Sequence, residues 1–125
     1  MQERPKISEA EWEVMKVLWG KSPQTANQVV QALTEKTSWK PKTIKTLLNR
    51  LAGKKAIGFE KNGREYLYKP LLSEDECVRA ETRSFIDRTG PKALKPMLAA
   101  FIEEQDLSDV EITELRQLLE QKGKE

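Results

Sequence analysis

The hydrophobic pattern of this 125-residue chain changes from a helical period to a strand period at residue 57. Before that point, three segments at about 9–19, 26–35 and 41–54 carry apolar residues on one helical face. After it, two β-prone runs, 57–61 and 65–69, flank Asn62-Gly63-Arg64, and an Asn-Gly pair in such a place is a strong hairpin signal. Three helices followed by a hairpin predict a mostly α fold with a small β-hairpin wing, the winged helix-turn-helix.

Four helix starts have the capping-box pattern, in which a hydroxyl residue is followed three positions later by Glu or Gln. They begin at Ser8, Thr25, Ser73 and Ser108. The last two, with the apolar periodicity that follows them, predict three further helices at about 73–89, 91–104 and 109–121. Pro96 lies within the second of these, so that helix either starts late or kinks there.

Charge divides the chain at Pro70. Residues 1–70 hold 14 basic and 7 acidic residues, a net charge of +7, whereas residues 71–125 hold 8 and 13, a net charge of −5. A basic half joined to an acidic half suggests a nucleic-acid module followed by something else. We therefore predict two domains, 1–72 for DNA binding and 73–125 for helical dimerisation. No apolar run is long enough to span a bilayer and no signal peptide is visible, so we expect a cytoplasmic location.

The residue types argue against an enzyme. The chain has no histidine, which removes the most frequent general base and metal ligand. Cys77 is the one cysteine and lies among acidic residues, which do not favour a reactive thiolate. The glycines form no phosphate-binding loop, and the acids at 74–76 suit a helix N-terminus. We expect no catalytic residue, no metal and no cofactor.

The third helix carries the residues best suited to bind DNA. Pro41 fits its first turn, and at 100° per residue the face opposite its apolar stripe contains no acid. Arg and Lys bind guanine or phosphate, Asn binds adenine, and Thr offers a hydroxyl or a methyl contact to thymine. Basic residues at the hairpin tip would meet the backbone. The DNA-contacting residues expected from this pattern are Lys42, Lys45, Thr46, Asn49, Arg50, Lys61 and Arg64.

The apolar stripes of the last three helices are too many to be buried within one small layer, so we expect them to pair with a second copy of the chain. A homodimer also suits a palindromic DNA site. The alternative is that these helices pack on their own N-terminal domain. The expected dimerisation residues are Phe85, Leu94, Met97, Leu98, Phe101, Ile102, Ile112, Leu115, Leu118 and Leu119.

A second function stays open at this point. Winged helices also serve as protein-interaction adaptors without sequence-specific DNA binding, because a fold does not determine a function. An adaptor would more often expose apolar or mixed-charge residues on its third helix.

Several runs resemble one family, the penicillinase and methicillin-resistance repressors of bacteria. They are residues 7–15 (ISEAEWEVM), residues 39–47 (WKPKTIKTL), Arg50-Leu51, Phe101 and residues 106–108. The resemblance covers nearly the whole chain. It implies a homodimeric repressor of transcription, connected with antibiotic resistance, that binds a palindromic operator in double-stranded DNA.

The resemblance also implies roles for particular residues. Family members contact DNA through the positions that match Lys42, Thr43, Lys45, Thr46 and Arg50, which adds Thr43 to the face described above. They are released from DNA when a regulatory protease cuts the dimerisation domain, typically between Asn and Phe. The matching pair in this sequence is Ala100-Phe101, with alanine in place of the asparagine.

Overall fold

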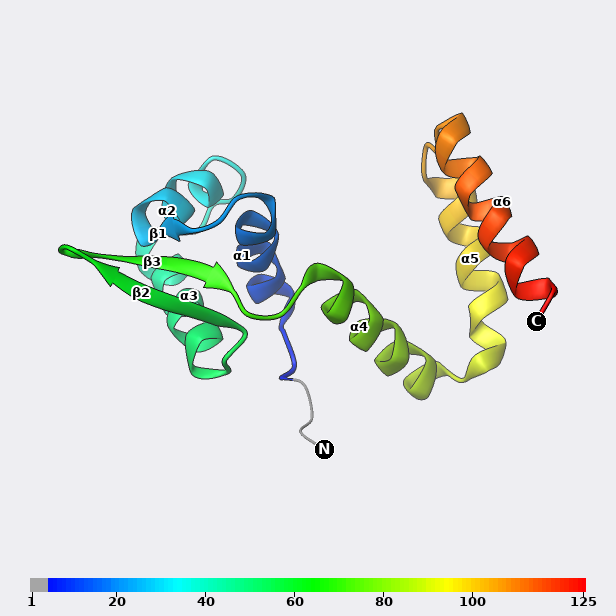
Figure 1. The fold of residues 1–125 in the computed structure, drawn as a ribbon, viewed down its shortest axis with the longest axis horizontal. Helices are drawn as coiled ribbons and strands as arrows, with labels where there is room; N and C mark the ends of the chain where they lie inside the picture. Colours follow the sequence, from blue (N-terminus) through cyan, green and yellow to red (C-terminus); the bar gives the residue numbers. More distant parts are fainter. Residues whose placement is uncertain (1–4) are drawn as a thin grey trace. The chain divides into compact units, whose positions relative to one another are not determined.

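The computed structural model describes residues 5–125. Contacts within the chain divide it between Glu81 and Thr82, so the division falls inside the helix α4 (Glu74–Thr89). The predicted domain boundary at residues 72 and 73 stays a prediction. The elements run in the order α1 (Glu9–Gly20), β1 (Gln24–Thr25), α2 (Ala26–Thr34), α3 (Pro41–Gly53), β2 (Ile57–Asn62), β3 (Glu65–Pro70), α4 (Glu74–Thr89), the 3₁₀ helix η1 (Pro91–Ala93), α5 (Leu94–Glu104) and α6 (Asp109–Gly123) (Figure 1).

All four predicted capping boxes form. The side chains of Ser8, Thr25 and Ser108 each accept a hydrogen bond from the backbone N–H three residues on, and the Glu or Gln side chain there accepts one from the N–H of the capping residue. At the start of α4, the Ser73 hydroxyl accepts from the Glu76 N–H and Glu76 accepts from the Ser73 N–H. Each cap satisfies two donors that a helix start would otherwise leave unpaired.

The wing is a three-stranded antiparallel sheet in the order β1-β3-β2. Strand β1, which the sequence did not predict, pairs Gln24 with Tyr68, and the amide of Gln24 donates to the carbonyls of Val17 and Lys21 at the end of α1. Strands β2 and β3 form the predicted hairpin, closed by pairing of Asn62 with Glu65. Gly63 has a φ of +66° in the tight turn between them, a conformation that glycine adopts without strain.

The core of the first unit, which ends at Glu81, lies among α1, α2, α3 and the sheet. Its fully buried side chains include the predicted inner faces of the helices: Val14, Met15, Leu18, Val29, Leu33, Ile44, Leu48 and Leu51. Trp12 and Trp19 meet edge to face with ring centroids 5.4 Å apart, and the Trp19 indole donates to the Leu72 carbonyl over 2.9 Å. Burial of each large apolar side chain stabilises the fold by about 1.5–3 kcal/mol.

An ion pair with a buried carboxylate connects α1 to the end of α3. Oε1 of Glu11 accepts from Lys54 Nζ over 2.5 Å and from the Ser8 N–H, and Lys54 Nζ also donates to the Lys6 carbonyl. Oε2 of Glu11 is buried without a hydrogen-bond partner among the described residues. Burial alone would raise the pKa of Glu11, but the hydrogen bonds from Lys54 and Ser8 outweigh it, and the pKa is lowered. The pair therefore depends on Lys54.

Residues 82–125 form a second unit of helices with few buried side chains. Pro96 falls in the first turn of α5, where its missing N–H leaves no helical hydrogen bond unmade, so the helix starts after η1 instead of kinking. Nine large apolar side chains in this unit are exposed: Leu94, Leu98, Phe101, Ile102, Val110, Ile112, Leu115, Leu118 and Leu119. Across residues 5–125, no helix is both long and apolar enough to cross a membrane.

Candidate nucleic-acid interface

Helix α3 buries one face and exposes the other as the pattern predicted. Pro41 lies in the first turn, and Ile44, Leu47, Leu48 and Leu51 are at most 4% exposed. The face toward solvent holds Lys42, Thr43, Lys45, Thr46, Asn49 and Arg50, all of them exposed. Helix α3 contains no acidic residue.

The cations of α3 have no acidic partner within the described chain. Lys42, Lys45 and Arg50 take part in none of the ion pairs between residues 5 and 125. Exposed helix faces commonly pair such charges with acids at i+3 or i+4, as Arg79 and Asp75 do on α4. Unpaired cations keep their charge available to phosphate groups and base edges.

The hydroxyl proton of Thr46 is already engaged in a hydrogen bond within α3. Its hydroxyl donates to the Lys42 carbonyl over 3.0 Å, one helical turn back. The oxygen can still accept a hydrogen bond, and the methyl group is free to contact a thymine methyl. Thr46 therefore suits an acceptor or apolar contact with a base.

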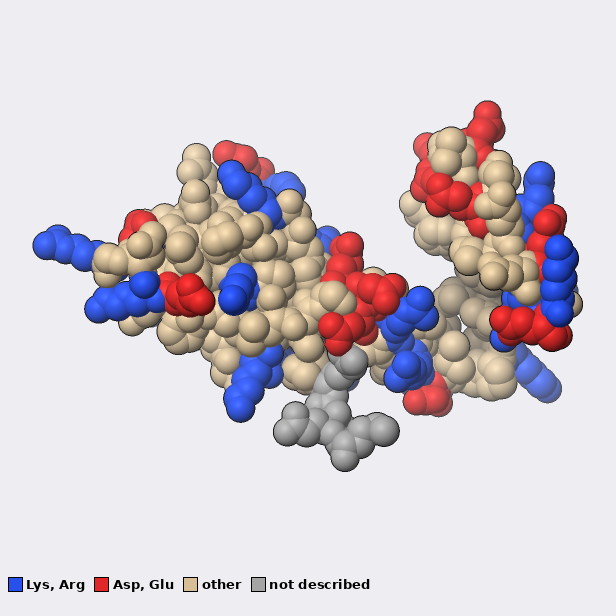
Figure 2. Space-filling view, in the orientation of Figure 1, with Lys and Arg blue, Asp and Glu red and all other residues tan. Residues whose placement is uncertain are grey.

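The wing places its basic residues beside aromatic ones. Phe59 and Tyr66, both exposed, meet with ring centroids 5.1 Å apart, and Lys61 pairs across the hairpin with Tyr66. Arg64 is exposed at the tip. Figure 2 shows Lys and Arg side chains projecting from the wing end of this unit, whereas acidic side chains gather at the first turn of α4.

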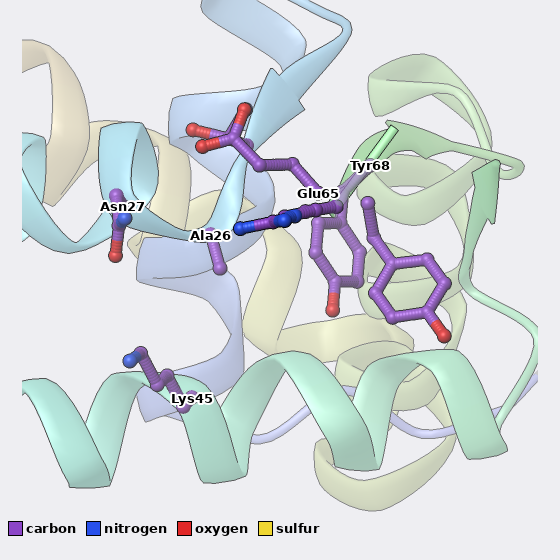
Figure 3. Close-up of a pocket in the computed structure, with 8 residues that line it drawn as sticks. Ala26, Asn27, Lys45, Glu65 and Tyr68 are labelled. Carbon is purple, nitrogen blue, oxygen red and sulfur yellow. The ribbon is translucent and has the colours of Figure 1, made fainter. Parts of the chain in front are cut away.

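A shallow pocket lies between the start of α2, the middle of α3 and the wing. Lys45 rises into it from α3 toward Ala26 and Asn27, while Tyr68 projects into it from β3 (Figure 3). We call it the α2–wing pocket. It is lined by Thr25, Ala26, Asn27, Lys45, Arg64, Glu65, Tyr66 and Tyr68.

The sequence predicted Lys45 and Arg64 as DNA contacts but missed the other residues of this pocket. Alternation along the second strand does place Tyr66 and Tyr68 on one face, which was an available signal. The approach of α2 to that face depends on β1, and two residues are too few to show a strand period. Trp39, which precedes α3 in the chain, is half-buried and packs against the core.

The other predicted site residues lie in or near the second unit. Phe85 and Met97 are half-buried, and the remaining eight expected dimerisation residues are exposed. Ala100 and Phe101 are both exposed on α5. Among residues 5–125 no group of His, Cys, Asp and Glu is arranged to hold a metal ion.

Three helices, a wing and an acid-free recognition face together define a winged-helix DNA-binding protein. Residues 7–121 match the penicillinase repressor family, and the chain belongs to that family of transcriptional repressors. It is 40% identical to a penicillinase repressor of Bacillus licheniformis over 121 residues, 97% of this chain and 94% of that one. It is 35% identical to the methicillin resistance regulatory protein MecI of Mammaliicoccus sciuri over 116 residues, 93% of this chain and 94% of that one.

Solved structures agree with the family and the fold. The DNA-binding domain of the repressor BlaI is 43% identical and superposes with a TM-score of 0.55 over 61% of this chain and 93% of that one. The monomeric form of Bacillus licheniformis BlaI, in complex with the blaP half-operator, is also 43% identical, with a TM-score of 0.54 over the same shares. These neighbours confirm the predicted winged helix.

Proposed function

We propose that this chain is a homodimeric repressor that binds a palindromic operator through α3 and the wing. The observation that carries the proposal is the solvent face of α3, which combines unpaired cations with Thr and Asn side chains and contains no acid. An α-helix fits the major groove of B-DNA, where those side chains distinguish base pairs. Lys61 and Arg64 at the wing would contact the backbone.

The dimer is supported by the apolar side chains of the second unit. Soluble monomers seldom expose large contiguous apolar surfaces, and α5 and α6 expose nine large apolar residues in a short stretch of chain. A monomeric form of the related BlaI binds a half-operator. We infer that two copies of this chain, paired through α5 and α6, occupy the two halves of one site.

Selection of the intact chain against random duplexes tests the proposal. We expect a palindrome, bound by two chains, with an affinity that falls steeply as salt rises because bound cations are released from DNA. Binding of all duplexes with equal affinity at physiological salt would reject a sequence-specific repressor and favour the adaptor function. Charge reversal at Lys42 separates the two, since only the repressor should lose its function.

Replacing Arg50 should relax the choice of one base pair. Arg50→Ala removes a side chain able to bond guanine at two atoms, so we expect a loss of roughly 1–3 kcal/mol on the selected operator and little on unrelated DNA. Lys92→Ala, in η1 outside the DNA-binding unit, is the control. Equal losses on both kinds of DNA would instead place Arg50 on a phosphate.

We also propose that a regulatory protease releases the repressor by cutting between Ala100 and Phe101. Both residues are exposed, and the cut would separate most of the apolar residues of α5 and α6 from the DNA-binding unit. Induced cells should contain a fragment ending at Ala100, identified by mass spectrometry. A chain that stays intact while its target genes are induced would rule this out.

A further inference from the structure

The size and the walls of the α2–wing pocket indicate what kind of group it could hold. Its volume is about 200 Å³, smaller than the roughly 300–1,000 Å³ of sites that enclose small organic molecules. Its walls come from β1, α2, α3, β3 and the turn that leads into β3 (Figure 3). The size suits a compact polar group carried by a larger ligand.

Tyr68 supplies a hydrogen-bond donor that nothing in the described chain uses. Its side chain lines the pocket and the residue is only 9% exposed, while its hydroxyl makes no hydrogen bond to residues 5–125 and is reached by solvent. Burial, and to a lesser extent nearby Tyr66, raises the pKa of Tyr68, so the hydroxyl keeps its proton at neutral pH. A hydroxyl donor at the end of a largely buried side chain, open to the pocket, is available to a group supplied from outside.

The other walls favour an anion. Lys45 and Arg64 bring two positive charges, and Ala26 and Asn27 form the first turn of α2, whose N-terminus carries partial positive charge. Glu65 is the single acid among the lining residues and opposes the anion in part. Two cations, a helix N-terminus and a phenol donor together exceed that one carboxylate.

We propose that the α2–wing pocket receives one phosphodiester group of the bound duplex, held by the Tyr68 hydroxyl, Lys45 and Arg64. The inference rests on the proposed DNA-binding function and deepens it. It moves Lys45 from the residues that read bases to those that position the backbone, and it adds Tyr68 to the interface. Thr46, Asn49 and Arg50 then remain for base recognition.

Removing single groups from the pocket gives distinct signatures in mobility-shift titrations of the full chain. Tyr68→Phe deletes one hydroxyl and keeps the ring, so binding to operator and to unrelated duplex should weaken roughly tenfold alike. The slope of log affinity against log salt should not change, because the hydroxyl is neutral. Lys45→Gln should weaken both duplexes and reduce that slope by about 1.

Two matched variants control the test. Tyr66→Phe removes a hydroxyl from a more exposed tyrosine of the same pocket and should have a smaller effect than Tyr68→Phe. Glu65→Gln removes the opposing acid and should tighten binding several-fold at low salt. Thermal unfolding of each variant must match the parent, so that a change in affinity does not reflect a change in folding.

A scan with methylphosphonates, which neutralise one DNA phosphate at a time, identifies the group. When the methylphosphonate replaces the phosphate that the pocket binds, one in each half-site, Tyr68→Phe should bind that duplex as tightly as the parent chain does. If the parent chain binds its operator and no position shows this coupling, the pocket assignment is wrong while the repressor function stands. If the parent chain binds no duplex specifically, the proposed function fails and the pocket assignment fails with it.

Discussion

In the proposed dimer, Leu115→Glu should separate the two subunits and weaken binding to the proposed palindrome at least about a hundredfold. Leu115 lies on α6 among the exposed apolar residues, and burying a carboxylate in an apolar interface is strongly unfavourable. Once two binding units are joined, the second binds at an effective concentration that commonly raises affinity by about 10²–10⁴-fold. Losing the dimer removes that gain, while affinity for a single half-site should stay unchanged.

Sedimentation equilibrium and titrations with whole and half operators measure both effects. The control is Arg116→Glu, which adds a carboxylate at the next, exposed position of the same helix and should leave the dimer intact. If Leu115→Glu sediments as a dimer, the subunits do not meet through this face of α6. If the variant is monomeric but binds the palindrome normally, DNA binding does not require a dimer.

Lys54→Met should destabilise the DNA-binding unit by about 2–3 kcal/mol at pH 7. It leaves the Glu11 carboxylate, whose side chain is 2% exposed, without its cation. Removing one partner of a buried pair typically costs about 3–5 kcal/mol, and we expect less here because the Lys54 side chain is 35% exposed. Calorimetric unfolding measures the loss, with Lys36→Met as a control at an exposed lysine outside any ion pair of the described chain.

The pH dependence follows from Glu11. In the parent chain the pKa of Glu11 is lowered, so its contribution to stability is present above the ordinary carboxyl pKa and is lost as pH falls through the lowered value. In Lys54→Met the Glu11 carboxyl stays buried but has lost its cation, so the pKa of Glu11 should rise. The difference in free energy of unfolding between the parent chain and Lys54→Met should therefore shrink in acid, where Glu11 takes up a proton.

A second substitution tests whether the stranded charge is the cause. Glu11→Gln combined with Lys54→Met removes that charge, so the double variant should be more stable at pH 7 than Lys54→Met alone. Equal stability of Lys54→Met and Lys36→Met would mean that the pair contributes little.

Local patterns were sufficient to predict the elements that bury one face. The spacing of Ile44, Leu47, Leu48 and Leu51 located α3 and its solvent face because helical geometry relates the two directly. Capping residues located four helix starts for the same local reason. The apolar stripes of α5 and α6 were likewise predictable from their spacing, and their pairing with a second copy of the chain stays a prediction.

Features that join distant segments were not predictable. Glu11 and Lys54 are 43 residues apart, and neither stands out from the many surface charges of the chain. The α2–wing pocket requires β1 to hold α2 beside β3, through only two residue pairs. Tyr68 therefore had the pattern of an ordinary strand residue, and only the fold shows that its hydroxyl lacks a partner.

The placement of the tryptophans makes the intact chain its own optical probe. Trp12, Trp19 and Trp39 are the three tryptophans of the sequence, and all pack on the core of the DNA-binding unit. Indole emission therefore reports on that unit alone, without a label, while circular dichroism reports on the helices of both units. Disagreement between the two signals during unfolding would reveal that the units melt separately.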